Sequence, residues 1–163
     1  MRMTGSLAEI ETSYIYRIAS VAALGGLLFG FDTAIINGAL LFLKRQFGWK
    51  DWQTEIAASS VLVGCIAGSS IAGWLSDRYG RRSILVLSAA IFTVSSLATA
   101  MPNDLASFAM ARLAAGIAIG IASMLAPLYI AEISPGAIRG RLVSLNQLAV
   151  MLGILISYII GWG

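Results

Sequence analysis

The sequence contains little charge for its length, and it contains no histidine. Only 12% of its 163 residues are charged, whereas roughly a quarter of the residues are charged in an ordinary soluble domain. So few charges would not cover a water-facing surface, which argues against a soluble enzyme. The missing histidine excludes His-ligated metal sites, Ser-His catalytic triads and histidine proton relays.

Cysteine is nearly absent as well. The one cysteine, Cys65, cannot form an intramolecular disulfide or a thiolate metal cluster. It stands in an apolar run between small residues, so we interpret it as a small core side chain. The motifs H-E-x-x-H and G-x-S-x-G of metalloproteases and hydrolases are also missing. The sequence therefore predicts no enzyme, no metal and no cofactor.

Apolar residues dominate what is present. They make up 58% of the chain, and the mean hydropathy is +0.85. Charged residues separate five apolar runs, and we expect spans at about 18–43, 56–76, 83–102, 105–132 and 142–162. A helix needs about 20 mostly apolar residues to cross a bilayer, and the runs lack the alternation of barrel strands. The sequence predicts an all-α membrane protein with five transmembrane helices.

The positions of the basic residues predict the orientation. Residues 1–16 form an N-terminal segment without the features of a cleaved signal peptide, and residues 17–163 form the transmembrane bundle. One side of the membrane carries most of the basic residues: Arg2, Arg17, Arg78, Arg81, Arg82, Arg139 and Arg141. The opposite side carries Lys44, Arg45 and Lys50. The positive-inside rule places the N-terminus in the cytoplasm. We therefore attribute the net charge of +3 to the basic residues that set the orientation in the membrane, and not to nucleic acid binding.

Two ionisable residues, Asp32 and Arg112, fall inside the predicted spans. At 1.5 Å per helical residue, Asp32 lies roughly 18 Å from Lys44 and Arg112 roughly 12 Å from Asp104, so their depths differ by only about 6 Å. A mutual salt bridge would lower the cost of burying both charges. Such a pair either holds two helices together statically or couples transport to protons, with Asp32 taking up a proton and releasing Arg112. We favour the second interpretation because charges inside the membrane are usually functional.

Further polar and aromatic residues point to a second cluster and to a binding surface. Glu132 lies roughly 30 Å from Arg112 along one helix, at the inner face, where it pairs with basic residues of the loops or remains an ordinary solvated charge. Asn146 and Gln147 stand near the start of the fifth span, where amides can hydrogen-bond neutral hydroxyls. Phe29 can offer an apolar face to a sugar ring, and each of these three can also be packing alone. Pro127 is expected to bend the fourth span.

Several motifs together resemble one known family. The segments Gly25–Thr33 and Asn37–Leu40 are similar to the first helix of the sugar porter family of the major facilitator superfamily, and Gly73–Arg82 resembles the loop after the second helix. The fourth helix and following loop carry the rest of the signature: Arg112, Gly116, Gly120, Pro127, Tyr129, Glu132 and Arg139–Arg141. Leu145–Leu148 resembles the start of the fifth helix. Ala114 stands where the family usually has a larger aliphatic residue, a mild departure.

The resemblance implies a carrier of twelve helices in two bundles, with alternating access to a substrate near the midplane. This chain would be an N-terminal fragment supplying five helices of the first bundle. An acid at the Asp32 position is found in the family's proton symporters and a neutral residue in facilitative glucose carriers. The Gln147 position binds sugar hydroxyls, and Phe29 and Asn146 are expected beside it. Ile154 stands where some members have a second glutamine, which leaves the substrate open.

The function predicted in this way is proton-coupled uptake of a sugar or polyol at the cell membrane. Its partners would be the sugar, protons, membrane lipid and the remaining helices of the same transporter, with no nucleic acid. The inner gate is expected to comprise Asp77, Arg78, Arg81, Arg82, Glu132, Arg139 and Arg141. The alternatives are a facilitative sugar uniporter, a non-transporting nutrient sensor of the same fold and a small assembly protein of five helices. The triplet Asp77–Tyr79 also occurs in heptahelical receptors, but here it follows the second span.

Overall fold

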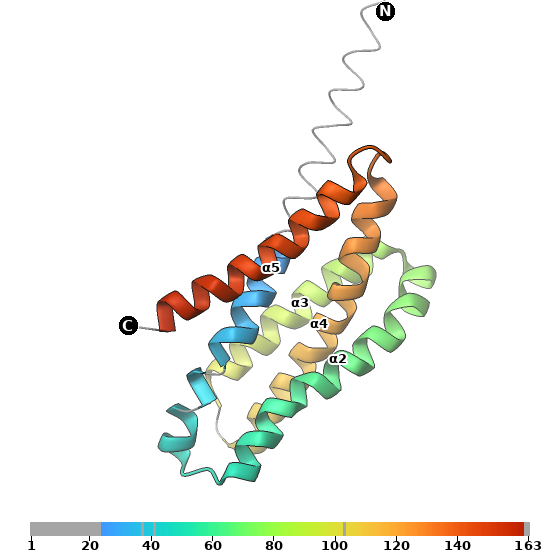
Figure 1. Ribbon diagram of the computed structural model, residues 1–163. Coiled ribbons are helices and arrows are strands. Elements are labelled where there is room, and N and C mark those ends of the chain that lie inside the picture. The colour runs from blue at the N-terminus through green and yellow to red at the C-terminus, as the bar shows by residue number, and fades with distance from the viewer. Residues whose placement is uncertain (1–23, 37, 41, 103, 162–163) are drawn as a thin grey trace, which may run out of the picture. The chain divides into compact units, whose positions relative to one another are not determined.

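Five long helices make up the computed structural model, which describes residues 24–36, 38–40, 42–102 and 104–161. The first helix runs from Leu24 to Phe47, and it is followed by α2 (Asp51–Tyr79), α3 (Arg81–Ala100), α4 (Leu105–Ile133) and α5 (Arg139–Gly161) (Figure 1). All five are long and apolar enough to cross a membrane, and the described residues contain no strand. The all-α prediction with five transmembrane helices is therefore confirmed. The predictions for residues 1–16, for Arg17 and for Asn37 lie outside the described residues.

The link between α2 and α3 is a single residue, Gly80. Its φ of 83° lies in the left-handed region that glycine adopts without steric cost. The sequence predicted a tight link over Asp77–Arg82. In the structure the charged residues of this link lie in the last turn of α2 and the first turn of α3, because one glycine suffices to reverse the chain.

The start of α4 is capped from both directions. The Ser107 N–H donates to Asp104 Oδ1 at 2.9 Å, and the Asp104 N–H donates to Ser107 Oγ at 3.1 Å. These bonds satisfy backbone donors that a helix N-terminus leaves free. Hydrogen bonding from Ser107, through its side chain first and its backbone second, holds the pKa of the Asp104 carboxyl below its usual value. Asp104 is therefore the residue that caps α4.

The chain divides into two compact units, and the larger one covers residues 33–126. In it, glycines bring α2 and α4 into backbone contact. A methyl group added at Gly64 would meet backbone atoms of Leu113 and lie 3.0 Å from the Cα of Gly116. One added at Gly120 would meet the backbone of Cys65. The glycines of both helices therefore allow the two backbones to approach closely, as small residues do at helix interfaces in membranes.

Two apolar clusters stabilise the larger unit at opposite ends of α2. One contains Leu40, Trp49, Ala57 and Phe108, and the other contains Ala72, Ile84, Ile121 and Leu125. Helix α3 contributes Ile84 to the second cluster, and Leu85 of the same helix packs against it. The first cluster joins the end of the first helix to α2 and α4.

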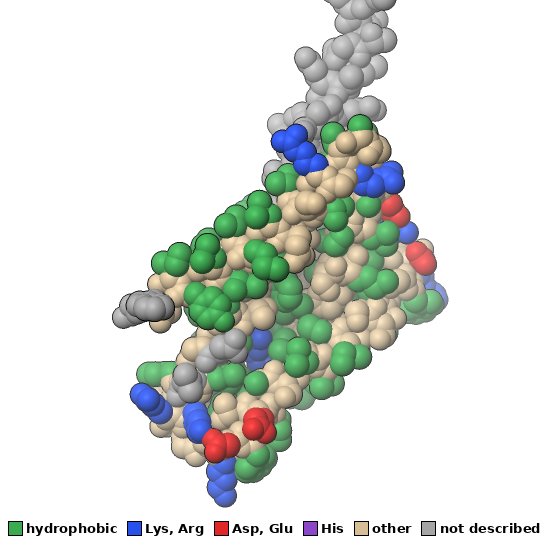
Figure 2. All heavy atoms as spheres, viewed as in Figure 1, with side chains coloured by type: hydrophobic (Ala, Val, Ile, Leu, Met, Phe, Trp, Pro, Cys, Tyr) green, Lys and Arg blue, Asp and Glu red, His purple; other side chains and the backbone are tan. Residues whose placement is uncertain are grey.

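The smaller unit joins the start of the first helix to the last part of α4 and to α5. Methyl groups added at Gly30 and Gly153 would collide with the backbones of Val150 and Leu27, respectively. Ile130 of α4 and Leu142 of α5 form a small buried cluster beside the α4–α5 turn. Pro127 lies inside α4, which continues to Ile133. Apolar side chains cover α2 and α5, whereas most charged side chains gather at helix ends (Figure 2).

Candidate functional site

Arg112 is the one charged side chain that is buried among the described residues. It lies in α4 with only 2% of its surface exposed, and it is the largest fully buried side chain of those residues. It lies close enough to Cys65 of α2 to act electrostatically on that thiol. Arginine keeps its proton in proteins, so its burial must be compensated by polar neighbours rather than by loss of charge. Burying a guanidinium within an apolar helix costs free energy, and residues that carry such a cost are usually functional, so Arg112 is a candidate functional residue.

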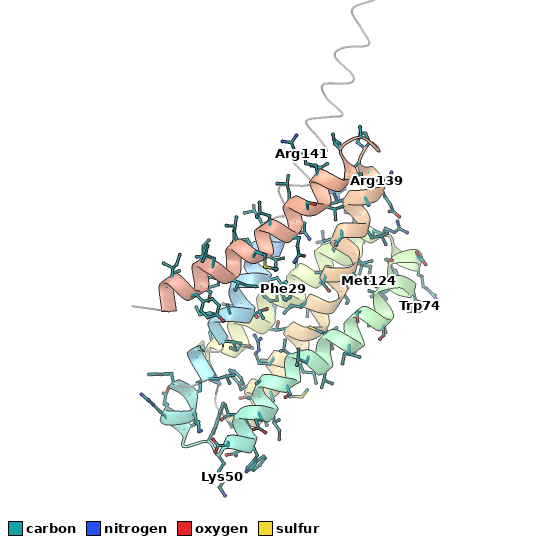
Figure 3. The ribbon with its side chains drawn as sticks, viewed as in Figure 1. Phe29, Lys50, Trp74, Met124, Arg139 and Arg141 are labelled. Atoms are coloured by element: carbon teal, nitrogen blue, oxygen red, sulfur yellow. The ribbon has the colours of Figure 1, made fainter. Side chains whose placement is uncertain are left out.

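Asp32 and Phe29 lie one turn apart on the first helix. Both are partly buried, and a separation of three residues places them on neighbouring positions of one helix face. Phe29 is labelled on the first helix in Figure 3. Asp32 ends the part of the first helix that belongs to the smaller unit, whereas Arg112 belongs to the larger unit. The pairing of Asp32 with Arg112 therefore stays a prediction.

The two amides predicted on α5 have different surroundings. Asn146 is partly buried. It packs against the first helix at Gly26, where an added methyl group would lie only 3.0 Å from Asn146 Oδ1. Gln147 is exposed. Within this unit, Asn146 thus contacts the helix that carries Phe29 and Asp32, while the Gln147 amide remains accessible to a hydroxylated ligand.

One half of the predicted inner gate lies at the α2–α3 turn. Arg81 Nη2 lies 3.8 Å from Asp77 Oδ1, so an ion pair bridges the two helices across Gly80. Arg82 is exposed. Arg78 instead lies over two rings, with its Cζ 5.7 Å from the centroid of Trp74 and 5.8 Å from that of Tyr79. These ring contacts were not predicted from the sequence, although the four-residue spacing from Trp74 to Arg78 could have indicated the first of them.

The other half of the predicted inner gate lies at the α4–α5 turn. Glu132 near the end of α4 and Arg139 and Arg141 at the start of α5 are exposed, and Figure 3 labels the two arginines there. These residues belong to the smaller unit, whereas Asp77, Arg78, Arg81 and Arg82 belong to the larger one. Each half is thus present at a helix turn, and a latch formed by the two halves stays a prediction.

The opposite end of the larger unit contains a cluster that was not predicted from the sequence. Lys44 of the first helix pairs with Asp51 at the start of α2. Between them, Trp49 stacks on Phe47 with ring centroids 5.6 Å apart. It also meets Phe108 edge-on at 5.7 Å. Alternating aromatic residues around a glycine in the Phe47–Asp51 turn are the signal that could have indicated this cluster. No group of three or more Cys, Asp or Glu residues suited to a metal occurs in the described ranges.

Comparison with known proteins gives a consistent result. The model of the family described as "Sugar (and other) transporter" matches residues 18–163. The chain is 44% identical over 153 residues to the D-xylose transporter of Levilactobacillus brevis, covering 94% of this chain and 33% of that protein. It is 42% identical over 147 residues to the arabinose-proton symporter of Bacillus subtilis, covering 90% of this chain and 32% of that protein.

Solved structures agree. A proton:xylose symporter of the major facilitator superfamily, bound to 6-bromo-6-deoxy-D-glucose, is similar with a TM-score of 0.84 and 38% identity, over 92% of this chain and 37% of that one. An inward open xylose transporter from Escherichia coli gives a TM-score of 0.80 and 36% identity, over 90% and 39% of the two chains. The chain therefore spans about a third of the length of the curated relatives it matches.

Proposed function

Because this chain belongs to the sugar porter family of the major facilitator superfamily, we propose that it forms part of a secondary active transporter for a sugar or polyol, driven by protons. The family is one of transporters rather than enzymes, and the chain is a multi-pass membrane protein. The matched relatives include an arabinose-proton symporter and a D-xylose-proton symporter. These names support both the substrate class and the coupling ion.

The observation that carries proton coupling is the burial of Arg112 in α4, together with an acid, Asp32, inside the first helix. In this proposal the carboxylate of Asp32 pairs with the guanidinium. Protonation of Asp32 from the outer side removes its charge, so the attraction to Arg112 falls and the helices carrying the two groups can move apart. The proton then leaves on the inner side and the pair forms again.

The substrate surface in this proposal is lined by Phe29 and Gln147, with Asn146 as their neighbour. Gln147 is exposed, so its amide is available to donate to and accept from a sugar hydroxyl. Phe29 offers the face of its ring to the apolar side of the sugar. Asn146 contacts the first helix, so it holds α5 in register with the helix that carries Phe29.

Alternating access in this proposal needs the helices that correspond to the remainder of the longer relatives. The N-terminus lies in the cytoplasm, as the distribution of basic residues favours, and residues 17–163 act as one moving bundle. At the cytoplasmic side, the Asp77–Arg81 pair and the Glu132, Arg139 and Arg141 group separate and rejoin as the inner gate opens and closes.

The test is uphill transport by the carrier that contains this segment, reconstituted into proteoliposomes with an imposed pH gradient. Asp32→Asn is expected to abolish proton-driven accumulation of radiolabelled sugar while sparing exchange of internal for external sugar, because a neutral amide cannot release a proton. The matched control is Asp51→Asn, which alters an exposed acid paired with Lys44 at a helix end and should leave accumulation intact.

Three outcomes would contradict this proposal. Unchanged accumulation in Asp32→Asn would remove the coupling role of that residue. Equilibration without accumulation by the unmodified carrier would identify a facilitative uniporter. Sugar binding without any transport would identify a nutrient sensor.

A further inference from the structure

An arginine close to two exposed aromatic rings lies at the C-terminal end of α2. The side chains of Trp74 and Tyr79 are 63% and 57% exposed, and the Arg78 guanidinium lies within 6 Å of both ring centroids. Trp74 lies on the outer side of the α2 ribbon (Figure 3). A cation at this distance from a ring is attracted to the ring face, so the two rings restrict the arginine to one region of the surface.

The position of this group along α2 corresponds to the membrane interface. Trp74 lies 23 residues after Asp51, or about 35 Å along a helix, which exceeds the hydrocarbon thickness of about 30 Å. The ion pair of Asp51 with Lys44 marks one interface, so Trp74, Arg78 and Tyr79 lie at the level of the headgroups on the other side. Tryptophan and tyrosine are enriched at that level because each combines an apolar ring with a polar group.

The charge of Arg78 is not neutralised by a neighbouring acid. Arg81, three residues later, pairs with Asp77, but Arg78 has no carboxylate within ion-pair distance in the part of the chain that the structure describes. Its contacts are to ring faces, which leave guanidinium N–H groups available to an acceptor. The planar guanidinium can donate two parallel hydrogen bonds to a phosphate. This bidentate geometry suits a phosphate group better than an acceptor that can take only one hydrogen bond.

We propose that Trp74, Arg78 and Tyr79 bind the phosphate of an anionic phospholipid, with the rings lying against its glycerol and upper acyl region. A membrane lipid fits better than a soluble phosphate because the two rings present exposed apolar surface at the interface, and a soluble phosphate would leave that surface uncovered. The site is separate from the sugar and proton groups, and Arg78 also belongs to the predicted inner gate, so the test measures lipid binding rather than transport.

The experiment uses the full chain with Trp74 as its only tryptophan, in vesicles of mixed phosphatidylcholine and phosphatidylglycerol. Quenching of Trp74 fluorescence is compared when either lipid carries brominated acyl chains. Brominated phosphatidylglycerol should quench more strongly than brominated phosphatidylcholine at equal mole fraction. Arg78→Gln should reduce this preference by up to about fivefold, the factor expected for one arginine near an anionic surface.

The matched control is Arg82→Gln, which removes the same charge from an exposed arginine of the same turn and should keep most of the preference. Added inorganic phosphate should not displace the lipid. Native mass spectrometry of phosphatidylglycerol retained by the chain gives a second measurement that does not rely on Trp74 emission. The proposal is overturned by equal quenching from the two lipids, by equal losses in the two variants, by displacement with free phosphate, or by a Trp74 that neither lipid quenches.

Discussion

Helices α3 and α4 are both apolar enough to cross a membrane, yet they are buried to different extents. Within the most apolar stretch of each helix, 44% of the α4 stretch is buried, whereas only 17% of the α3 stretch is buried. Buried residues of α3 follow one narrow stripe containing Ile84, Ser88 and Ser95. In α4, buried residues occur around most of the helix between Phe108 and Ile121.

The two helices are nearly equal in hydropathy, so the difference in burial reflects how closely each helix packs against its neighbours. Gly116 and Gly120 allow α4 to approach the α2 backbone, and Ala111, Ala115 and Ala118 keep its other faces narrow. No glycine occurs within α3, and its large side chains, such as Val86, Val94 and Leu97, point outward. In lipid, apolar side chains gain little from leaving one oily environment for another, so close packing decides which helix becomes central. A central helix is also where an arginine can be shielded from lipid.

The largest expected effect tests this packing directly. Gly116→Leu should lower the free energy of unfolding by about 3 kcal/mol or more, because the added side chain meets the backbone of α2, which cannot rotate away. Ala90→Leu is the matched change in α3, at an exposed position, and it should alter stability by less than about 0.5 kcal/mol. Thermal unfolding of the purified chain in detergent, followed by circular dichroism, measures both.

Equal losses in the two variants would contradict the account of α4 as the central helix. A loss at Ala90 larger than that at Gly116 would reverse the assignment and make α3 the helix enclosed by neighbours.

A smaller effect is expected at the helix starts. The hydrogen-bonded carboxylate of Asp104 caps α4, whereas α3 begins after Gly80 without a side-chain cap. The pKa of Asp104 is lower in the folded chain than its usual value of 3.8. Its contribution is therefore complete at neutral pH and is lost as the pH falls through the folded pKa. Asp104→Asn retains a capping oxygen that does not titrate, so its melting temperature should fall less than that of the unmodified chain on acidification.

Melting temperatures measured across the acid range would decide this point. Parallel pH profiles of the two proteins would show that the Asp104 carboxylate contributes nothing that depends on its charge.

The number and type of the helices could be predicted from the sequence, because five uninterrupted apolar runs leave few alternatives in lipid. The exact turns were less predictable. The single-residue turn at Gly80 places Asp77 and Arg81 within helices, because charged residues near an interface can continue a helix beyond the apolar run. Hydropathy marks where the membrane ends, and it does not mark where the helix ends.

The sequence selects the residues of the candidate site by their chemistry, and their surroundings come from the structure. Arg112 was identified because a charge within an apolar run is costly, and its burial agrees with that expectation. The different environments of Asn146 and Gln147 depend on which face of α5 meets Gly26. Adjacent residues of a helix point in different directions around its axis, and the sequence does not show which of these directions faces the neighbouring helix. The rings around Arg78 were missed because charge patterns alone suggest acidic partners for an arginine.

The most direct test of the central proposal, a buried pair of Asp32 and Arg112, is a double-mutant cycle of unfolding free energies. The cycle compares Asp32→Asn, Arg112→Gln and the double variant with the unmodified chain in detergent at neutral pH. A coupling energy of about 1 kcal/mol or more is predicted, because groups that interact do not contribute additively. Additivity within about 0.3 kcal/mol would show that the two residues act independently, and it would contradict proton coupling through their separation.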